Sequence, residues 1–243
     1  MVLKRIAIGS LTDLVARRKE RLQSLAADLR ARHGVRVDTK KVDLTKRSAR
    51  AKLVDSLNEG DLNVVGVCNN AGYGSTGYFA KLSLEREQDQ VELNVVALHE
   101  LTGAFLPQMI ERGGGAVLNV ASVAAFQPIP GMATYAATKA FVLSFSEALA
   151  NELGGTGVSV STLCPGVTPT EFSGVAGNKD LEDNVPGLFT TSAEEVAAAG
   201  IDAMIDGKRT VTPGAHNKFA SMAGRHTPRT LLLPVLGRVG TSR

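Results

Sequence analysis

Three side chains in the middle of the chain have the types needed for acid–base chemistry at an oxygen atom. Tyr135 and Lys139 are four residues apart at the start of a predicted helix, so both project from one face. A lysine ammonium beside a phenol lowers the phenol pKa from its usual value near ~10, which lets tyrosine act as acid or base near neutrality. Ser122 directly follows a predicted strand, where its hydroxyl can bind a substrate oxygen. Taken one at a time, each residue also has a structural interpretation. Tyr135 and Lys139 fit ordinary positions on a helix surface, and Ser122 fits a serine at the end of a strand.

Asn94 is a fourth candidate for the same chemistry. It lies within an apolar stretch of a predicted helix over 84–111. A buried amide needs hydrogen-bond partners. We expect it either to bond a backbone group of the neighbouring helix or to hold a water that relays protons to Lys139.

The elements that must position these residues follow from two alternating hydrophobic periods. Short apolar runs predict strands, and longer segments with helical spacing predict the helices between them. The strands are expected at 13–16, 35–42, 62–68, 116–121 and 158–163, and the helices at 18–33, 46–58, 84–111, 132–153 and 193–206. This alternation predicts an α/β fold, with a Rossmann-like doubly wound parallel sheet in a single domain over residues 1–243.

Polar or glycine-containing segments follow three of the predicted strands. They are 69–72, Ser122 and the pair Pro165-Gly166. Ligands of open parallel sheets bind outside the carboxyl ends of the strands. The sequence therefore predicts one site at this edge of the sheet.

Taken in order, these residues resemble the short-chain dehydrogenase/reductase family over about residues 12–212. The matching set is Asn69-Asn70-Ala71-Gly72, Asn94, Ser122, Tyr135-Ala136-Ala137-Thr138-Lys139, and Pro165-Gly166 with Thr170. Each motif is modest, but the set in this order is specific. The resemblance implies an oxidoreductase that reduces a carbonyl or oxidises a secondary alcohol, with the hydride supplied by a nicotinamide cofactor.

The resemblance also implies a role for each residue. Tyr135 would be the general acid or base, Lys139 would lower its pKa and bind the nicotinamide ribose, and Ser122 would orient the substrate oxygen. Asn94 would hold the proton-relay water. The residues expected to line the cofactor are Asn70, Ala71, Gly72, Pro165, Gly166 and Thr170, together with Tyr135 and Lys139.

Two further pairs are expected at the adenine end of the cofactor. Asp43-Leu44 follows a predicted strand and resembles the pair that meets the adenine, although Asp43 equally fits a carboxylate at a helix N-terminus. Arg17-Arg18 follow the strand at 13–16, where an arginine suits the 2′-phosphate of NADP and an acid would suit NAD. They also fit the start of a basic helix face. We expect NADP rather than NAD.

The sequence departs from the family at its beginning. The family pattern has a TGxxxGxG turn after its first strand, which places the pyrophosphate on backbone N–H groups, and this sequence has none. The segment 6–10 holds one glycine and leaves no room for a crossover before the next strand. We therefore expect the first strand and helix to be missing or degenerate within 1–16. Three explanations of the missing turn are open. The start is misassigned or frameshifted, the protein is catalytically impaired or inactive and binds a partner, or it binds NADP weakly.

The remaining features narrow the class of protein. The net charge of +3 is weak and scattered, which argues against nucleic-acid binding, and the partner expected is a small carbonyl or alcohol substrate. No segment resembles a signal peptide or a transmembrane span, so a cytoplasmic location is expected. By resemblance, a homodimer or homotetramer would form through the helices 84–111 and 132–153.

Two segments lie outside the motifs. Residues 171–191 are rich in glycine and proline and fit either a mobile lid over a substrate or a plain surface loop. Phe79, Phe126 and Phe172 are candidates for an apolar pocket, although single aromatic residues more often belong to the core. The tail 227–243 has an apolar run between arginines, which fits a membrane or subunit surface as well as a short amphipathic tail folded back on its own domain.

Overall fold

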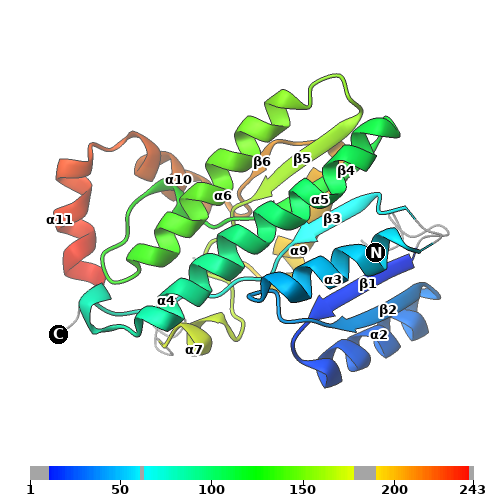
Figure 1. Ribbon diagram of the computed structural model, residues 1–243. Helices are drawn as coiled ribbons and strands as arrows, with labels where there is room; N and C mark the ends of the chain where they lie inside the picture. The colour runs from blue at the N-terminus through cyan, green and yellow to red at the C-terminus, as the bar shows by residue number, and fades with distance from the viewer. Residues whose placement is uncertain (1–10, 61–62, 178–189, 241–243) are drawn as a thin grey trace. The chain divides into compact units, whose positions relative to one another are not determined.

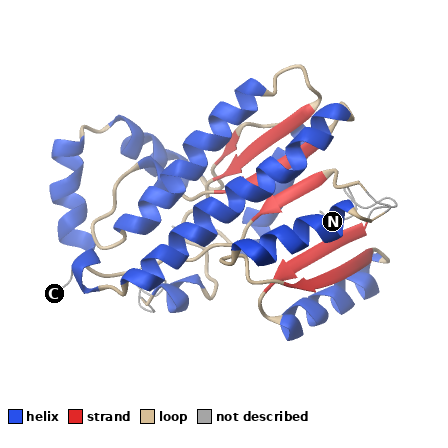
Figure 2. Cartoon of the chain, viewed as in Figure 1, coloured by secondary structure: helices blue, strands red, loops and turns tan. Residues whose placement is uncertain are grey.

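The protein is described from a computed structural model that covers residues 11–60, 63–177 and 190–240 (Figure 1). The chain divides into two compact units, residues 1–63 and residues 64–243, each described by itself. Both consist of parallel strands connected by helices (Figure 2).

The first unit is a strand–helix–strand crossover. β1 (Leu11–Ala16) and β2 (Arg36–Lys41) pair in parallel along their whole length, and α2 (Lys19–His33) connects them. Gly34 ends α2 in the left-handed conformation at φ 62°. α3 (Arg47–Asn58) follows β2.

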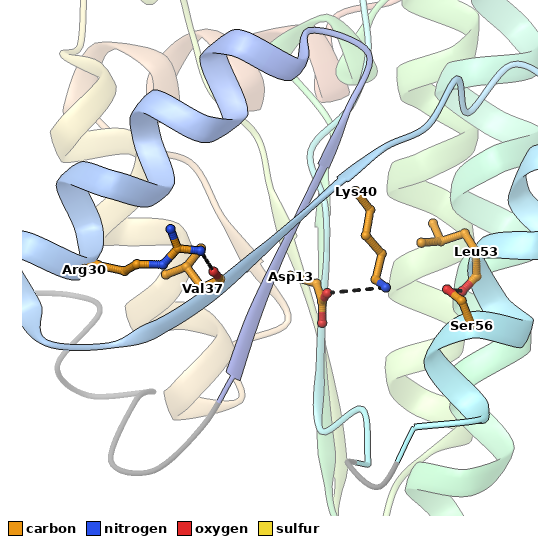
Figure 3. Close-up of polar contacts among 6 residues, drawn as sticks. All are labelled: Asp13, Arg30, Val37, Lys40, Leu53 and Ser56. Carbon is orange, nitrogen blue, oxygen red and sulfur yellow. Dashed lines mark hydrogen bonds and ion pairs between the residues drawn. The ribbon is translucent and has the colours of Figure 1, made fainter.

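Side-chain contacts hold this crossover together (Figure 3). Lys40 of β2 forms an ion pair with Asp13 of β1 at 3.9 Å, and the guanidinium of Arg30 on α2 donates to the carbonyl of Val37. The helix is thereby tied to the strand that it precedes.

The second unit contains a four-stranded parallel sheet. Its order is β3 (Gly66–Asn69), β4 (Gly115–Val120), β5 (Val158–Leu163) and β6 (Thr210–Val211). Asn69 lies opposite Asn119, and Val120 lies opposite Leu163, so the carboxyl ends of β3, β4 and β5 share one edge. The segments predicted to form one site all begin at this edge.

Helices cover both faces of this sheet. Leu118 of β4 and Leu163 of β5 pack with Val196 and Met204 of α9 (Ala193–Asp206). The next residue on β4, Asn119, points to the opposite face, where its amide donates to Ser146 of α6 (Ala133–Glu152) at 2.9 Å. The alternation of side chains along β4 therefore confirms the doubly wound arrangement (Figure 1).

The described strands form two sheets, of two and four strands, rather than one continuous sheet. Among the described strands, β3 pairs only with β4, and its residues Gly66 and Cys68 are exposed. The expected degenerate first strand falls largely on residues 1–10, which lie outside the described residues. Its absence stays a prediction.

The helix predicted over 84–111 has a break in its hydrogen-bond pattern. α4 (Leu84–Val91) passes into a π-helical turn, Glu92–Ala97, and the chain continues as α5 (Leu98–Glu111). A π turn inserts one residue into the α-helical spacing and re-aims the side chains that follow, and such turns often occur at functional sites. Here the turn contains Asn94.

Several short elements were not predicted from the sequence. They are β6, the 3-10 turns η1 (Phe79–Lys81) and η3 (Val123–Phe126), and the helices α7 (Phe172–Ala176), α10 (Ala215–His226) and α11 (Arg229–Gly240). The expected lid at 171–191 begins with α7, and most of the remainder lies outside the described residues. The expected tail, 227–243, contains α11.

A buried polar network joins the sheet to the helices. The Asn69 amide donates to Thr102 of α5 at 3.0 Å and to the Asn119 carbonyl oxygen at 2.8 Å, and Asn119 in turn donates to Ser146. All four side chains are buried. Satisfied buried amides fix the relative position of the elements they connect.

We predict that Asn119→Ala destabilises the protein by about 2–3 kcal/mol, because Ser146 loses its donor and Asn69 loses an acceptor in a dry environment. Urea unfolding followed by circular dichroism measures the change. Asn151→Ala, at an exposed position near the end of α6, is the matched control and should change the free energy of unfolding by no more than ~0.5 kcal/mol. Equal effects of the two substitutions would contradict a structural role of the network.

Candidate active site

Ser122 and Tyr135 meet at the carboxyl end of β4. Both are buried, at 9% exposure each, and their side chains are hydrogen-bonded to each other. The Ser122 hydroxyl also accepts from the backbone N–H of Ala124 at 3.1 Å, which caps the turn η3. The serine is therefore held in place from two sides.

Lys139 lies one helical turn after Tyr135 and is buried against the same strand. Its Nζ donates to the carbonyl of Val120, the last residue of β4, at 2.8 Å. The Nζ is 5.8 Å from the centroid of the Tyr135 ring. Burial lowers the pKa of Lys139 to about 8, because an ammonium is poorly solvated there.

The pKa of Tyr135 moves opposite to the direction expected from the sequence. Burial raises the pKa of the phenol, and the hydrogen bond with Ser122 offsets only part of that increase. Loss of solvation is the larger effect, and the expected lowering of the phenol pKa is not seen. Near neutral pH, Tyr135 is therefore a protonated phenol with a proton to donate.

Asn94 is bound to the loop that follows β3. Its Oδ1 accepts from the backbone N–H of Tyr73 at 3.1 Å, and its Nδ2 donates to the Tyr73 carbonyl at 2.9 Å and to Thr138 Oγ1 at 3.1 Å. The expected backbone partner is therefore a loop residue rather than a residue of the neighbouring helix. Thr138 adjoins Lys139, so Asn94 connects the loop after β3 with the reactive turn of α6.

Gly72 lies between Asn94 and Lys139. A Cβ atom at this position would be 2.9 Å from the Asn94 Oδ1 and 3.4 Å from the Lys139 Nζ. Only a residue without a side chain lets the loop approach both groups this closely. Asn70, Ala71 and Gly72 are all exposed, as expected of residues available to a ligand.

The segment after β5 contacts the segment after β4. The backbone N–H of Val123 donates to the Pro165 carbonyl at 2.9 Å. Gly166 packs closely on Asn217 of α10, and Thr170 is exposed, with its hydroxyl accepting from the Phe172 N–H at 3.2 Å. The structure thus brings Gly72, Asn94, Ser122, Tyr135 and Lys139 together, with Pro165 against the residue that follows Ser122.

The other predicted residues belong to the first unit. Arg17 is exposed after β1, and Arg18 is the residue before α2. Asp43 accepts from both the N–H and the hydroxyl of Thr45. Burial raises the pKa of Asp43, but the bonds from Thr45 and the charge of Arg17 together lower it below its ordinary value. Leu44 is buried.

Of three residues beside the phenol, Phe172 was a candidate for an apolar pocket, whereas Gly74 and Met132 were not assigned to the site from the sequence. The ring of Phe172 lies 5.2 Å from the Tyr135 ring, between centroids. A Cβ atom on Gly74 would lie 2.9 Å from Phe172 Cζ and 3.4 Å from Met132 Cε, so both side chains pack on this glycine. They form an apolar wall beside Tyr135. Of the three phenylalanines expected at a pocket, Phe172 lies here, whereas Phe79 is exposed and Phe126 packs below Arg225.

The parallel sheets define the fold class as α/β, and the Ser122–Tyr135–Lys139 cluster lies at the carboxyl edge of the larger sheet. Residues 3–180 match the family described as short chain dehydrogenase. The chain belongs to this family. It is 39% identical over 186 residues to the serine 3-dehydrogenase of Rhizobium radiobacter, which covers 74% of this chain and 72% of that protein. It is 39% identical over 162 residues to the sulfoacetaldehyde reductase 2 of Chromohalobacter salexigens, covering 66% and 64% of the two chains.

Solved structures show the same fold. A short-chain dehydrogenase from Sphingobium yanoikuyae in complex with NADPH is 32% identical, with a TM-score of 0.80 over 96% of this chain and 89% of that one. A structure concerned with 7beta-hydroxysteroid dehydrogenase stereoselectivity is 25% identical, with a TM-score of 0.82 over 97% of this chain and 90% of that one. These matches confirm the predicted Rossmann-like α/β fold class, and the single domain over residues 1–243 stays a prediction.

The buried lysine predicts a characteristic dependence of stability on pH. The pKa of Lys139 is about 8 in the folded chain against 10.5 for an ordinary lysine, so between these values the unfolded chain binds more protons and stability increases with pH. Below pH 8 the buried charge costs on the order of 3 kcal/mol. We therefore expect Lys139→Met to be more stable than the parent at pH 7, and this advantage to shrink as the pH approaches 10.

Urea unfolding at a series of pH values measures this difference. Lys52→Met is the control, because Lys52 is exposed on α3 and its removal should shift stability equally at every pH in the range. An unchanging gap between Lys139→Met and the parent would show that the amine is solvated in the folded protein.

Proposed function

We propose that this protein is an NADP-dependent oxidoreductase that reduces a carbonyl or oxidises a secondary alcohol. The observation that carries the proposal is the hydrogen-bonded pair of Ser122 and Tyr135 with Lys139 beside it, at the carboxyl edge of a parallel sheet. A protonated phenol and a hydroxyl that converge on one point fit the recognition of a single substrate oxygen.

The residues present fit a nicotinamide cofactor at two places. Lys139 has three N–H donors, and the Val120 carbonyl takes one of them, which leaves donors for a ribose hydroxyl. Arg17 and Arg18 supply two guanidinium groups suited to a 2′-phosphate. The similar dehydrogenase from Sphingobium yanoikuyae was solved with NADPH, which supports the same preference here.

The side chains divide the proton chemistry between them. NADPH would supply the hydride to the carbonyl carbon. Ser122 orients the carbonyl oxygen, and Tyr135 transfers its phenolic proton to that oxygen. Burial keeps this proton on Tyr135 until a substrate takes it, since it raises the phenol pKa. The Lys139 ammonium then stabilises the phenolate that the transfer leaves behind. Oxidation of an alcohol uses the same groups in reverse.

Asn94 acts by positioning in this proposal. Its amide holds the Tyr73 backbone and the Thr138 hydroxyl, and Thr138 in turn donates to the Tyr135 carbonyl at 2.8 Å. The three bonds align the loop after β3 with the turn of α6 that carries Tyr135 and Lys139. A water relay to Lys139 through Asn94 remains a further proposal.

An inactive or impaired protein is the second candidate. The observation in its favour is the lack of a TGxxxGxG turn in the sequence, because that turn provides the pyrophosphate cradle of the family pattern. Titration calorimetry with NADPH separates the two functions. Micromolar binding supports the oxidoreductase, and a folded chain without NADPH binding supports a protein that has kept the fold for another role.

We also propose that the protein self-associates through the helices 84–111 and 132–153. The exposed apolar side chains Val91, Ile110 and Phe141, each 40% exposed, lie on these helices and support this assignment. Phe141 stacks on Phe145 at 5.8 Å, which gives that surface a rigid aromatic element.

We expect Tyr135→Phe to lower the rate of NADPH-dependent carbonyl reduction by about 10²–10⁴-fold, because it removes the proton donor and keeps the ring. The assay follows loss of NADPH absorbance across a panel of ketones and aldehydes. Tyr78→Phe, at a 51% exposed tyrosine, is the control and should retain the parent rate. Parent-like turnover by Tyr135→Phe would exclude the mechanism.

We expect Arg17→Ser and Arg18→Ser, separately and together, to raise the KM for NADPH much more than that for NADH. Each lost phosphate contact should cost about tenfold, because charge-assisted bonds to phosphate contribute about 1.5–3 kcal/mol. Arg32→Ser is the control, as Arg32 is an exposed arginine at the far end of α2 that pairs with Asp28. Equal changes for the two cofactors would remove these arginines from the 2′-phosphate site.

A further inference from the structure

The charges of the chain are divided very unevenly along the sequence. The last 37 residues, 207–243, contain seven lysines and arginines and no aspartate or glutamate. The whole chain has 27 basic and 24 acidic residues, which leaves 20 basic and 24 acidic residues for positions 1–206. A modest overall charge of +3 therefore hides a basic segment joined to an acidic remainder. Such asymmetry indicates an anionic partner for the basic segment.

The same segment exposes large apolar side chains. On α10, Phe219 is 76% exposed and Met222 is 62% exposed, and their spacing of three places them on one side of the helix. On α11, Leu231 is 65% exposed. Lys218 and Arg229 are exposed beside these residues in the sequence. Exposed apolar side chains interspersed with cations distinguish this surface from an ordinary solvated one.

The opposite side of α10 is fixed to the candidate active site. Asn217, Ser221 and Gly224 are buried at helical spacing. Asn217 packs under Gly166, and a Cβ atom on Gly224 would lie 2.6 Å from the side-chain oxygen of Gln127 in the segment between β4 and α6. Arg225 lies 5.3 Å from the Phe126 ring and pairs with Glu147 of α6 at 3.2 Å. α10 is thus anchored on the segments after β4 and β5, and Phe219 and Met222 face outward.

α11 continues the basic segment along the chain. It follows α10 closely and stands at the side of the second unit, outside the helices that cover the sheet (Figure 1). Within the described residues, no helix is long and apolar enough to cross a membrane. Short amphipathic helices that combine exposed apolar side chains with cations are found in the plane of bilayer interfaces.

We propose that α10 and α11 form a docking surface for an anionic lipid bilayer. Phe219, Met222 and Leu231 enter the headgroup region, and Lys218 and Arg229 pair with lipid phosphates. The apolar side chains favour a bilayer over a nucleic acid, which would be met by cations and polar groups. The positive charge favours anionic lipid over a neutral surface. Because α10 also packs on the segments after β4 and β5, docking places that end of the sheet close to the membrane.

Vesicle flotation tests this proposal with the intact protein. Vesicles of phosphatidylcholine mixed with phosphatidylglycerol should carry the protein upward, and vesicles of phosphatidylcholine alone should carry much less. Lys218→Gln should weaken partition about fivefold, which corresponds to the ~1 kcal/mol that one cation contributes near an anionic surface. Phe219→Ser should weaken it at least ~10-fold, since an apolar ring no longer leaves water.

Lys52→Gln and Leu25→Ser are the matched controls, because both residues are exposed in the first unit, and neither should alter partition. Unchanged unfolding midpoints for all four variants exclude misfolding as the cause. Equal binding to neutral and anionic vesicles, or none to either, would overturn the proposal. Two further results would overturn it. If the protein dimerises without lipid and Phe219→Ser abolishes the dimer, the surface belongs to a second copy. If the protein binds DNA and Phe219→Ser leaves that binding unchanged, the surface belongs to a nucleic acid.

Discussion

The hydrogen bond between the Lys139 ammonium and the Val120 carbonyl is the constraint on which the candidate site depends. It joins α6 to the last residue of β4 in a place without solvent. Ser122 follows Val120 by two residues, and Tyr135 precedes Lys139 by one helical turn. One buried contact therefore sets the distance between the serine hydroxyl and the phenol. A charge buried with so few partners reduces stability, which is the usual cost of a preorganised site.

Two polar connections keep α6 and the sheet in this position. Below the site, Asn69 and Asn119 connect β3 and β4 to Thr102 of α5 and Ser146 of α6. Beside the site, Asn94 connects the loop after β3 to α6, and the π turn directs its amide toward that loop. Amide groups suit this task because each can donate and accept at once, which specifies direction as well as distance.

Much of this arrangement is predictable from the sequence, because it depends on local patterns. The apolar runs of β4 and β5 predict buried parallel strands, and the helical spacing over 18–33 predicts α2. Ligands of parallel sheets bind at the carboxyl ends of the strands, which predicts a site at Ser122 with Tyr135 beside it. The π turn, in contrast, has a sequence like that of an ordinary helix and differs from it only in its hydrogen bonds, so the sequence does not reveal it. Gly74 is visible only as a glycine until Phe172 and Met132 are seen to pack against it. α10 was missed because its buried face consists of Asn217, Ser221 and Gly224, which carry no hydrophobic period.

The direction of the Tyr135 pKa shows where reasoning from residue types fails. A tyrosine and a lysine four residues apart predict an acidified phenol if both remain solvated, but burial acts on each group separately and favours its neutral form. The pKa of the phenol is raised and that of the ammonium is lowered to about 8. The protein thus stores a proton on Tyr135 and holds a weakly favoured cation beside it. In the reaction proposed above, transfer of the phenolic proton to a substrate oxygen would form a phenolate next to that cation, and the two charges would stabilise each other where water cannot. The unfavourable burial of Lys139 in the resting protein would then be relieved as the proton moves, which is the condition under which an interaction accelerates a reaction.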